Sequence, residues 1–352
     1  MFAQVYFPET LSRESLDHYL EQGWFRMGQT IFTTNFLNFK NQLYSALWLR
    51  ASLREFVPSK AQQKIARLNE KFRVEIQKAS ITPEKEMLFA TYKLKVPFEA
   101  SASLQQLLYG KNDTNIYNTY EVLLYDGDKL IGVGYFDVGI ASAEGISSFY
   151  DPAYKKFSLG KYLIFLKMSY CKSLRLRYFY PGYFVPGYRA FDYKLELSNS
   201  IEYFQLHTAR WIDIQNFSPG KTPLAHMVEK LKSLQDYVAH CGLKTNLLQY
   251  EFFDANLIPD LKGMDLFDFP VFLNLELLGV RDPRLVVFDV RDDQYHVLQC
   301  VSIWEPNFLQ ETPGFYNAQL LRVGEELFAS HLLLNVLNFI VAAKADSDRV
   351  TD

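Results

Sequence analysis

Three neighbouring stretches carry the clearest signals of the fold: YEVLLYDGDKLIGVGYFDV (120–138), ISSFYDP (146–152) and SLGKYLIFLKMSYCKSLRLRYFY (158–180). The first contains two apolar runs joined by Asp126-Gly127-Asp128, where a glycine tolerates the positive φ of a hairpin turn. The second is a short apolar run that ends at Asp151-Pro152. In the third, Ser158 is expected to cap a helix over 159–174, and a strand over 176–180 follows directly. The predicted order is strand, strand, strand, helix, strand.

That order is found in the central half of an N-acetyltransferase-like (GNAT-like) fold. We therefore expect an α+β protein with a GNAT-like α/β-sandwich catalytic domain at 81–204, a small N-terminal α+β domain at 1–80 and an extra α+β region at 205–352. Acetyl-CoA users of this fold bind pyrophosphate with a Gly-rich loop at the helix start. Residues 158–161 (SLGK) hold one glycine, which disfavours an acyl-CoA N-acyltransferase and leaves the helix N-terminus for a different phosphate.

The flanking residues continue the mixed pattern. Helices are expected to end near Gly23, to run over 61–71 after the capping-box pair Ser59 and Gln62, and to begin at Thr82-Pro83. Strands are expected over 31–57 and 72–76. The C-terminal part predicts a helix over 223–241, strands near 271–279, 285–290 and 295–304, and a last helix over about 316–342.

The composition is that of a folded protein with uneven charge. Of the 352 residues, 49% are hydrophobic, and the formal net charge is −3, far from the composition of disordered chains. Residues 151–200 carry 9 basic and 3 acidic side chains, whereas residues 201–352 carry 12 basic and 21 acidic ones. We expect an anionic partner to meet the first 200 residues, although ordinary solvated faces explain the same charges.

Missing motifs exclude several classes of function. The cysteines at 171, 241 and 300 form no CxxC motif and no disulfide framework. The sequence has no HExxH, GxSxG, Walker A or GxGxxG motif. It shows neither a secretory signal nor an apolar run long enough for a bilayer. We therefore expect a cytoplasmic protein with no membrane and no DNA as partners.

Six short motifs, in order along the chain, resemble those of one enzyme family. They are GWFRMG (23–28), FVPSKAQQ (56–63), SSFYDP (147–152), SLGKY (158–162), YFYPGYFV (178–185) and FDYK (191–194). Together they resemble the aminoacyl-tRNA–protein transferases of the N-degron pathway, which include arginyl-tRNA–protein transferases and bacterial aspartate/glutamate leucyltransferases. The resemblance covers about residues 15–200 and does not reach 205–352.

The chain departs from this family at the position of an N-terminal cysteine cluster. Family members usually carry those cysteines just after the arginine-glycine element, which GWFRMG (23–28) resembles. This chain has TTNFL (33–37) there, and its first cysteine is Cys171. Without thiolates there, we expect no zinc or iron–sulfur cluster and no metal site. Phe191 also stands where the family commonly has Met. A catalytically idle homologue that binds RNA or protein is therefore the alternative to an active enzyme.

The resemblance implies transfer of an amino acid, Arg or Leu, from charged tRNA to the free α-amino group of an acceptor protein. Aminoacyl-tRNA is the donor, and no cofactor is expected because the ester is already activated. The enzyme must hold amine and ester together, deprotonate the amine and stabilise the oxyanion. Asp151 is our candidate for orienting or deprotonating the amine, and Tyr150 and Tyr183 are candidates for the oxyanion. An Asp-Pro turn and core packing of the tyrosines explain the same residues.

Further residues within the motifs are expected to bind the tRNA end or the substrate. They are Arg26, Ser158, Lys161, Tyr180, Tyr193 and Lys194. Cations and a helix N-terminus suit phosphates, and tyrosine rings suit the terminal adenine. Lys64, Arg67 and Lys71 lie on one face of the expected basic helix, which forms either an outer tRNA track or a solvated face.

The remaining expectations concern the acceptor and the acidic region. An acceptor beginning with Asp or Glu suits the basic segment 175–189. For 205–352 three roles are open, namely binding the acceptor protein, capping the transferase domain and forming a dimer contact. Its negative charge is expected to keep it off the tRNA.

Overall fold

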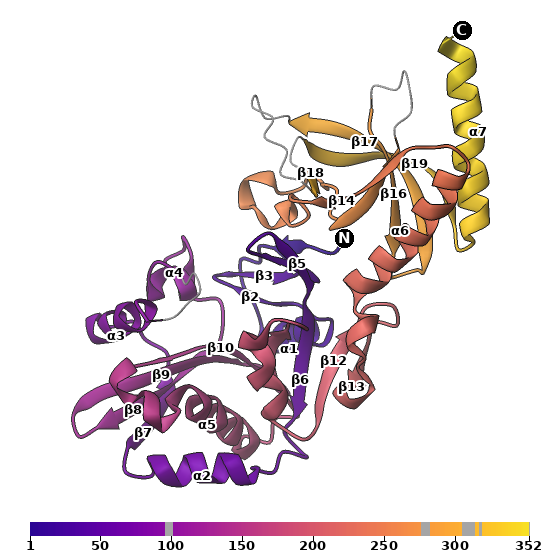
Figure 1. The fold of residues 1–352 in the computed structure, drawn as a ribbon. Helices are drawn as coiled ribbons and strands as arrows, with labels where there is room; N and C mark the ends of the chain where they lie inside the picture. The colour runs from indigo at the N-terminus through magenta and orange to yellow at the C-terminus, as the bar shows by residue number, and fades with distance from the viewer. Residues whose placement is uncertain (96–100, 276–281, 305–313, 317–318, 352) are drawn as a thin grey trace.

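An eight-stranded mixed sheet forms the lower lobe of the computed structural model, which describes residues 1–95, 101–275, 282–304, 314–316 and 319–351 (Figure 1). Its strands, in spatial order, are β13 (Arg210–Asp213), β12 (Ile201–Gln205), β6 (Leu47–Ser52), β11 (Tyr178–Phe184), β10 (Ser142–Tyr150), β9 (Lys129–Val138), β8 (Thr119–Asp126) and β7 (Arg73–Lys78). Only β10 and β11 pair in parallel within this sheet. The mixed α+β class expected from the sequence is confirmed.

The central strands agree with the local sequence signals. The expected hairpin joins β8 and β9, where Asp126 pairs with Lys129 and Gly127 has a φ of 60°. β10 begins at Ser142, four residues before the expected start at Ile146. The sheet also takes β6 and β7 from the segment 1–80 and extends to β13, so it crosses the divisions expected at 80 and 204. The three-domain division itself stays a prediction.

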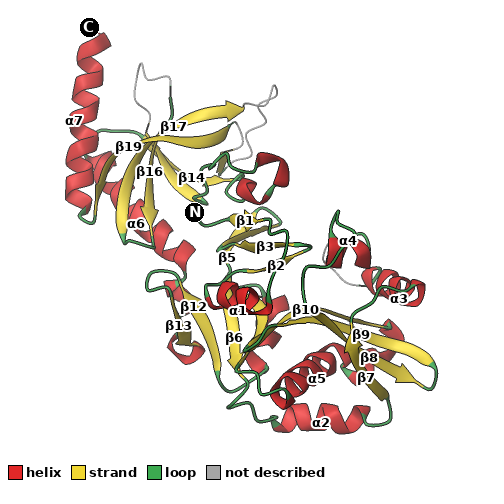
Figure 2. Ribbon diagram, turned by 180° about the vertical axis from the view of Figure 1, so that it is seen from behind, coloured by secondary structure: helices red, strands yellow, loops and turns green. Residues whose placement is uncertain are grey.

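Helices cover both faces of the sheet (Figures 1 and 2). α2 (Lys60–Asn69) and α5 (Leu159–Ser173) lie on one face, and buried residues of α5 share an apolar core with the strands. α1 (Arg13–Glu21), α3 (Pro83–Lys93) and α4 (Leu104–Tyr109) lie on the other face. The capping box before α2 is confirmed, as is the start of α3 at Thr82-Pro83.

The cap expected from Ser158 is wrong. Ser158 stands at the N-cap position of α5, but its side chain makes no capping hydrogen bond and its φ is 53°. A 3₁₀ helix, η1 (Pro152–Phe157), ends at the same residue. Ser158 therefore adopts the left-handed conformation that closes η1, and not the extended one from which a capping side chain reaches the helix.

β10 and β11 diverge after a short paired segment. They pair in parallel from Ser142 with Tyr178 to Glu144 with Tyr180. β10 then shifts register against β9 after Gly145, and β11 shifts against β6 before Gly182. Pro181 has no N–H with which to continue the ladder. The sheet consequently opens between these two strands.

A second, six-stranded sheet forms the upper lobe (Figure 1). Its strands, in spatial order, are β18 (Phe315–Tyr316), β14 (Thr245–Tyr250), β15 (Val271–Leu275), β16 (Arg284–Asp289), β17 (Gln294–Trp304) and β19 (Leu320–Ser330). Helices α6 (Pro223–His240) and α7 (Leu333–Thr351) pack against it. In the part of the chain that the structure describes, no helix is long and apolar enough to cross a membrane.

The last helix expected over 316–342 is wrong in its first half. Residues 320–330 form β19, which pairs antiparallel with β17 from Leu320 opposite Trp304 to Ser330 opposite Tyr295. This pairing joins distant segments and overrides the local pattern that suggested a helix. The other expected elements of this region are present, although part of the strand expected near 271–279 lies outside the described residues.

The N-terminal residues connect the two lobes. A three-stranded sheet of β1 (Gln4–Tyr6), β3 (Thr30–Thr33) and β2 (Phe25–Met27) and a hairpin of β4 (Phe36–Phe39) and β5 (Gln42–Ser45) lie between the large sheets (Figure 1). Phe2, Phe36 and Leu43 are buried in the apolar core of the upper lobe. The backbone N–H groups of Phe2 and Ala3 also donate to Asp268. The upper lobe is therefore packed directly on the N-terminal elements.

Candidate functional site

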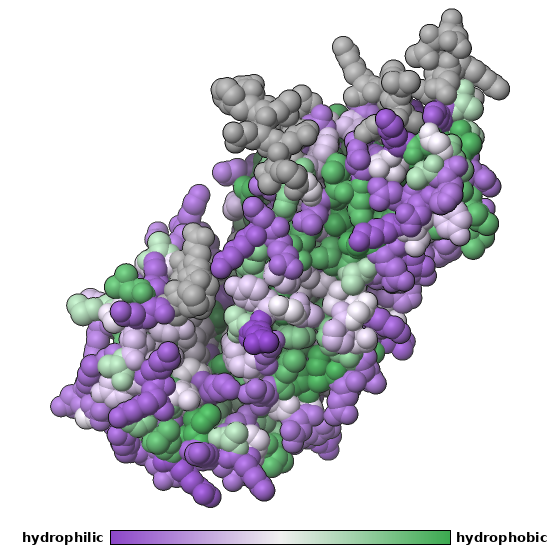
Figure 3. Space-filling model, in the orientation of Figure 1, coloured by the Kyte–Doolittle hydropathy of each residue, from purple (hydrophilic) through white to green (hydrophobic). Residues whose placement is uncertain are grey.

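A cavity of about 730 Å³ lies where β10 and β11 separate. Residues of β2, β3, β10 and β11, the end of α4, the 3₁₀ helix η2 (Arg189–Glu196) and Pro259 of the upper lobe line it. In Figure 3 the surface is hollowed between the part that carries α3 and α4 and the rest of the molecule. The volume is within the range of small-ligand sites. Three of the expected site residues, Arg26, Tyr183 and Lys194, line this cavity.

Lys194 is a buried amine in the cavity wall. Its Nζ donates to the carbonyl oxygen of Tyr183 at 2.7 Å and lies 5.1 Å from the ring centroids of both Tyr183 and Phe191. Gly182 makes room for it, since a Cβ at Gly182 would lie 3.1 Å from Nζ. No carboxylate of the described residues forms an ion pair with Lys194, and burial lowers its pKa to about 7. Lys194 therefore changes charge near neutral pH.

Glu144 is a buried carboxyl in the same cavity wall. Its Oε1 accepts a hydrogen bond from the backbone N–H of Arg26 at 3.0 Å. Its Oε2 is buried without a hydrogen-bond partner. Burial and the neighbouring Asp137 raise the pKa of Glu144 to about 8, against the opposing effect of Arg26. Glu144 is not among the site residues expected from the sequence, because the strand was expected to start at Ile146. The available signal was an acidic residue inside an otherwise apolar stretch.

Arg26 is bound to other parts of the protein. Its guanidinium forms a buried ion pair with Asp137 at 3.0 Å and donates to Thr119 Oγ1 at 2.9 Å. It also donates to the carbonyl oxygens of Gly28 and Leu108. These contacts tie β2 to β8, β9 and α4. They support a structural role in the cavity wall, and phosphate binding by Arg26 stays a prediction.

Asp151 and Tyr150 do not belong to the cavity lining. Asp151 follows β10, accepts from the backbone N–H of Ala153 at 2.9 Å and pairs with Lys129 at 2.6 Å. Burial alone would raise the pKa of Asp151, but these hydrogen bonds outweigh it and lower the pKa. The Tyr150 ring lies 5.6 Å from that of Tyr92 and close to Gly160. Asp151 thus caps η1, and its catalytic role stays a prediction.

The start of α5 is a separate surface. Lys161 is half-exposed and forms an ion pair with Glu196 at 2.8 Å. Ser158 and Lys161 do not line the cavity. The structure therefore does not place them with Lys194 and Tyr183, and their role in phosphate binding also stays a prediction.

Burial affects the other three expected tyrosines, Tyr180, Tyr183 and Tyr193, of which only Tyr183 is among the described residues that line the cavity. Tyr183 lines the cavity with its ring centroid 5.1 Å from that of Trp48, and burial raises its pKa. Tyr180 is buried behind it, where burial also raises its pKa despite a hydrogen bond with Arg50. Burial raises the pKa of Tyr193 to about 12. All three therefore stay protonated at neutral pH.

A second buried lysine supports the site from behind. Lys167 of α5 donates to the carbonyl oxygens of Tyr135 at 3.0 Å and Ser147 at 2.8 Å. Ser147 directly follows the register shift that moves β10 away from β11. Burial lowers the pKa of Lys167 to about 7. Lys167 therefore ties the irregular part of β10 to β9.

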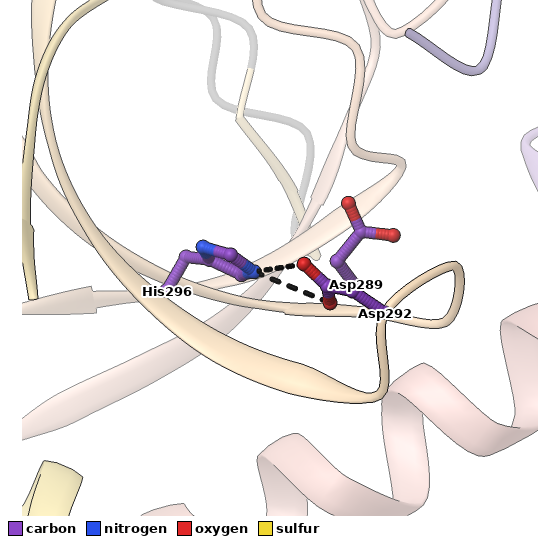
Figure 4. Close-up of side chains that lie close together, drawn as sticks. All are labelled: Asp289, Asp292 and His296. Carbon is purple, nitrogen blue, oxygen red and sulfur yellow. Dashed lines mark hydrogen bonds and ion pairs between the residues drawn. The ribbon is translucent and has the colours of Figure 1, made fainter. Parts of the chain in front are cut away.

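One group of potential metal ligands occurs among the described residues, and it lies in the upper lobe. Side-chain atoms of Asp289, Asp292 and His296 lie within 4.8 Å of one another. Figure 4 shows the His296 ring facing Asp292, at an Nε2–Oδ2 distance of 3.1 Å. His296 Nδ1 is 2.6 Å from Glu326, and Arg291 Nε donates to Asp289 at 2.9 Å. Ion pairs within the protein therefore account for this group.

Residues 33–37, where the resemblance places a cysteine cluster, are part of the packed interior. Phe36 packs edge-on against Phe2 with ring centroids 5.1 Å apart. Thr34 Oγ1 donates to the carbonyl oxygen of Phe36, and Trp48 Nε1 donates to that of Thr34. Packing and hydrogen bonds therefore stabilise this segment without metal ligands.

Diverging strands that enclose a buried amine and a buried carboxyl suit an enzyme that handles acyl and amino groups. Comparisons with known proteins agree. Residues 66–202 match the family described as arginine-tRNA-protein transferase, C terminus. An aspartate/glutamate leucyltransferase of Leptospira interrogans is 30% identical over 218 residues, which is 60% of this chain and 83% of that protein. One of Campylobacter jejuni is 26% identical over 194 residues, which is 53% of this chain and 79% of that protein.

This chain belongs to the aminoacyl-tRNA–protein transferase family, whose members use aminoacyl-tRNA as donor and a protein N-terminus as acceptor. The resemblance found in the sequence is thereby confirmed. Solved structures align at low scores: the L-PGS of Bacillus licheniformis has a TM-score of 0.33 and 10% identity over 51% of this chain and 52% of that chain. At that score the likeness carries no argument.

Proposed function

We propose that this protein transfers leucine from leucyl-tRNA to proteins whose first residue is Asp or Glu. The family supplies the reaction type, and the names of the relatives supply this donor and acceptor. The cavity supports leucine over arginine, the other donor that the sequence left open. Phe25, Phe32 and Trp48 line it and can bury an isobutyl group.

The observation that carries the proposal is the cavity between β10 and β11. A GNAT-like topology is supported by the antiparallel order β8, β9, β10, the parallel pair β10 and β11, and α5 connecting that pair. In this arrangement the diverging strands offer free backbone groups to an acyl group. The 3′ end of the tRNA would enter here, with its ester beside Tyr183 and Lys194.

The chemistry requires no external activation. The acceptor amine attacks the ester carbonyl carbon, a C–N bond forms, and the bond to the ribose 3′ oxygen breaks with transfer of a proton to that oxygen. Protonated Lys194 or the Tyr183 hydroxyl is suited to stabilise the oxyanion. Lys111, exposed at the cavity edge, is suited to the carboxylate of an acidic acceptor residue.

An outer tRNA contact is supported along α2 and just beyond its end, where Lys71 follows the helix. Lys64, Arg67 and Lys71 are exposed, and no ion pair engages them among the described residues. Lys71 lies over the rings of Phe72 and Phe157. Substituting all three by Gln should weaken tRNA binding and reduce its dependence on salt, because each phosphate contact contributes to that slope. An unchanged salt dependence of tRNA binding would mean that these three side chains contact solvent and not tRNA.

The decisive experiment measures transfer of radiolabelled Leu or Arg from charged tRNA to peptides beginning with Asp, Glu, Lys or Arg. We expect label only with leucyl-tRNA and the Asp or Glu peptides. Label from arginyl-tRNA would overturn the donor assignment. Label on the Lys or Arg peptides would overturn the acceptor assignment. tRNA binding without transfer would identify the idle homologue.

A further inference from the structure

Glu144 holds an oxygen atom that the protein itself does not use. One carboxyl oxygen is fixed by the backbone N–H of Arg26, while Oε2 is buried with no hydrogen-bond partner in the described structure. A buried polar atom without a partner costs free energy. Since Glu144 lines the cavity, a ligand that brings a hydrogen-bond donor to this wall supplies the missing partner.

The surrounding charges favour a cationic donor group. Arg26 contacts Glu144 through its backbone N–H, whereas its guanidinium is paired with Asp137. Asp137 of β9 lies opposite Glu144 of β10 in the antiparallel register, so both side chains are on the same face of the sheet and Asp137 adds negative charge there. Among the described lining residues Glu144 is the sole carboxyl group, whereas Arg26, Lys111 and Lys194 are basic, so Glu144 is the position in the lining at which a cation finds an opposite charge. An ammonium group is therefore the ligand chemistry that fits this position.

We propose that Oε2 of Glu144 binds the α-ammonium group of the acceptor protein and takes the proton that this group must lose before attack. This inference rests on the proposed function, which supplies an acceptor with a free N-terminus. One proton passes from the ammonium nitrogen to Oε2, and the neutral amine forms the C–N bond. A second proton passes from the attacking nitrogen to the ribose 3′ oxygen as the C–O bond breaks. Release of the Glu144 proton to solvent then restores the site.

The acidities of the two groups match. Burial and Asp137 raise the pKa of Glu144 to about 8, and a free α-amino group titrates near 8 as well. Proton transfer between groups of equal pKa has no thermodynamic cost, which favours general base catalysis. The other titratable groups facing Glu144 are Arg26, Asp137 and Tyr117. The donor amino group needs no deprotonation, so the acceptor is the amine that requires this base.

The test compares Glu144→Gln with the wild-type protein. Glutamine keeps the oxygen that accepts from Arg26 and replaces Oε2 by an NH₂ group, which repels an ammonium. Above pH 8, where Glu144 is mainly ionised, we expect the KM for an Asp-initiated peptide to rise about 10- to 100-fold, the range for a lost charged hydrogen bond. Loss of the base should also lower kcat by about a hundredfold or more. The KM for leucyl-tRNA should change less than about twofold. Glu75→Gln makes the same chemical change in an exposed ion pair on β7 and should leave both constants unchanged.

A binding measurement without turnover separates the outcomes. Wild-type protein should bind the free peptide more tightly than its N-acetylated form, and Glu144→Gln should bind the two alike. Preserved discrimination in Glu144→Gln, or a rise confined to the KM for leucyl-tRNA, would overturn the assignment. If the wild-type protein neither binds nor labels any peptide, the proposed acceptor and the role of Glu144 both fail, whereas labelling of Lys- or Arg-initiated peptides overturns only the proposed acceptor class. Thermal unfolding checks that the variant is folded.

Discussion

Replacing Lys194 by methionine tests whether the buried amine holds an anionic part of the donor. Methionine fills similar space without a charge or a hydrogen-bond donor. Burial lowers the pKa of Lys194 to about 7, so the protonated fraction falls from about nine tenths one pH unit below this value to about one tenth one unit above it. Only the protonated form attracts a phosphate or an oxyanion. Donor affinity should therefore fall about tenfold, or ~1.4 kcal/mol, across these two pH units.

The assay is fluorescence anisotropy with tRNA carrying leucine through a 3′ amide, which resists hydrolysis at alkaline pH. Wild-type protein should show the tenfold fall, while Lys194→Met should bind more weakly at the acidic end and show little pH dependence. The variant also loses the hydrogen bond to Tyr183, which costs about 1 kcal/mol of stability. Lys172→Met, an exposed lysine of α5, should retain the pH dependence. If Lys194→Met keeps the wild-type pH dependence, Lys194 does not hold the anionic part of the donor.

Three further substitutions test the surroundings of the site. The pKa of Lys167 is about 7 in the folded protein and 10.5 for an ordinary lysine. At any pH between these two values, the folded state therefore binds fewer protons at Lys167 than the unfolded state does. The unfolding free energy of the wild-type protein should therefore rise with pH in this window. Its slope should exceed that of Lys167→Met by up to ~1.4 kcal/mol per pH unit, as measured by urea titrations. Gly182→Ala should cost about 1–2 kcal/mol by thermal unfolding and raise the KM for leucyl-tRNA, because φ is 84° and the new Cβ would crowd Lys194 Nζ. Asp151→Asn should reduce kcat less than about threefold if Asp151 only caps η1, and a loss above about a hundredfold would establish it as the base.

Features set by neighbouring residues were predictable from the sequence. The hairpin at Gly127, the capping box at Ser59 and Gln62 and the start of α3 at Pro83 depend on contacts within a few residues, and all are present. Ser158 shows where this reasoning fails. Its conformation is imposed by η1, which ends at the same residue, so the capping pattern alone was misleading.

Features set by pairing of distant segments were not predictable. β19 forms because residues 320–330 pair with β17, and β10 extends to Ser142 because it pairs with both β9 and β11. The second of these errors removed Glu144 from the strand and therefore from the candidate site. A single carboxylate in the sequence gives no sign of whether it will be buried or left without a partner.

Short motifs and the periodicity of nearby residues are enough to establish the family, the α+β class and the local elements, so these features can be read without the fold. The site, in contrast, depends on how distant segments pack together. The cavity joins residues as distant as Arg26, Glu144, Tyr183 and Lys194, and the properties of Glu144 and Lys194 come from burial that the packed strands impose. A carboxyl group with a raised pKa and an amine with a lowered one exist only once the chain has excluded water from both.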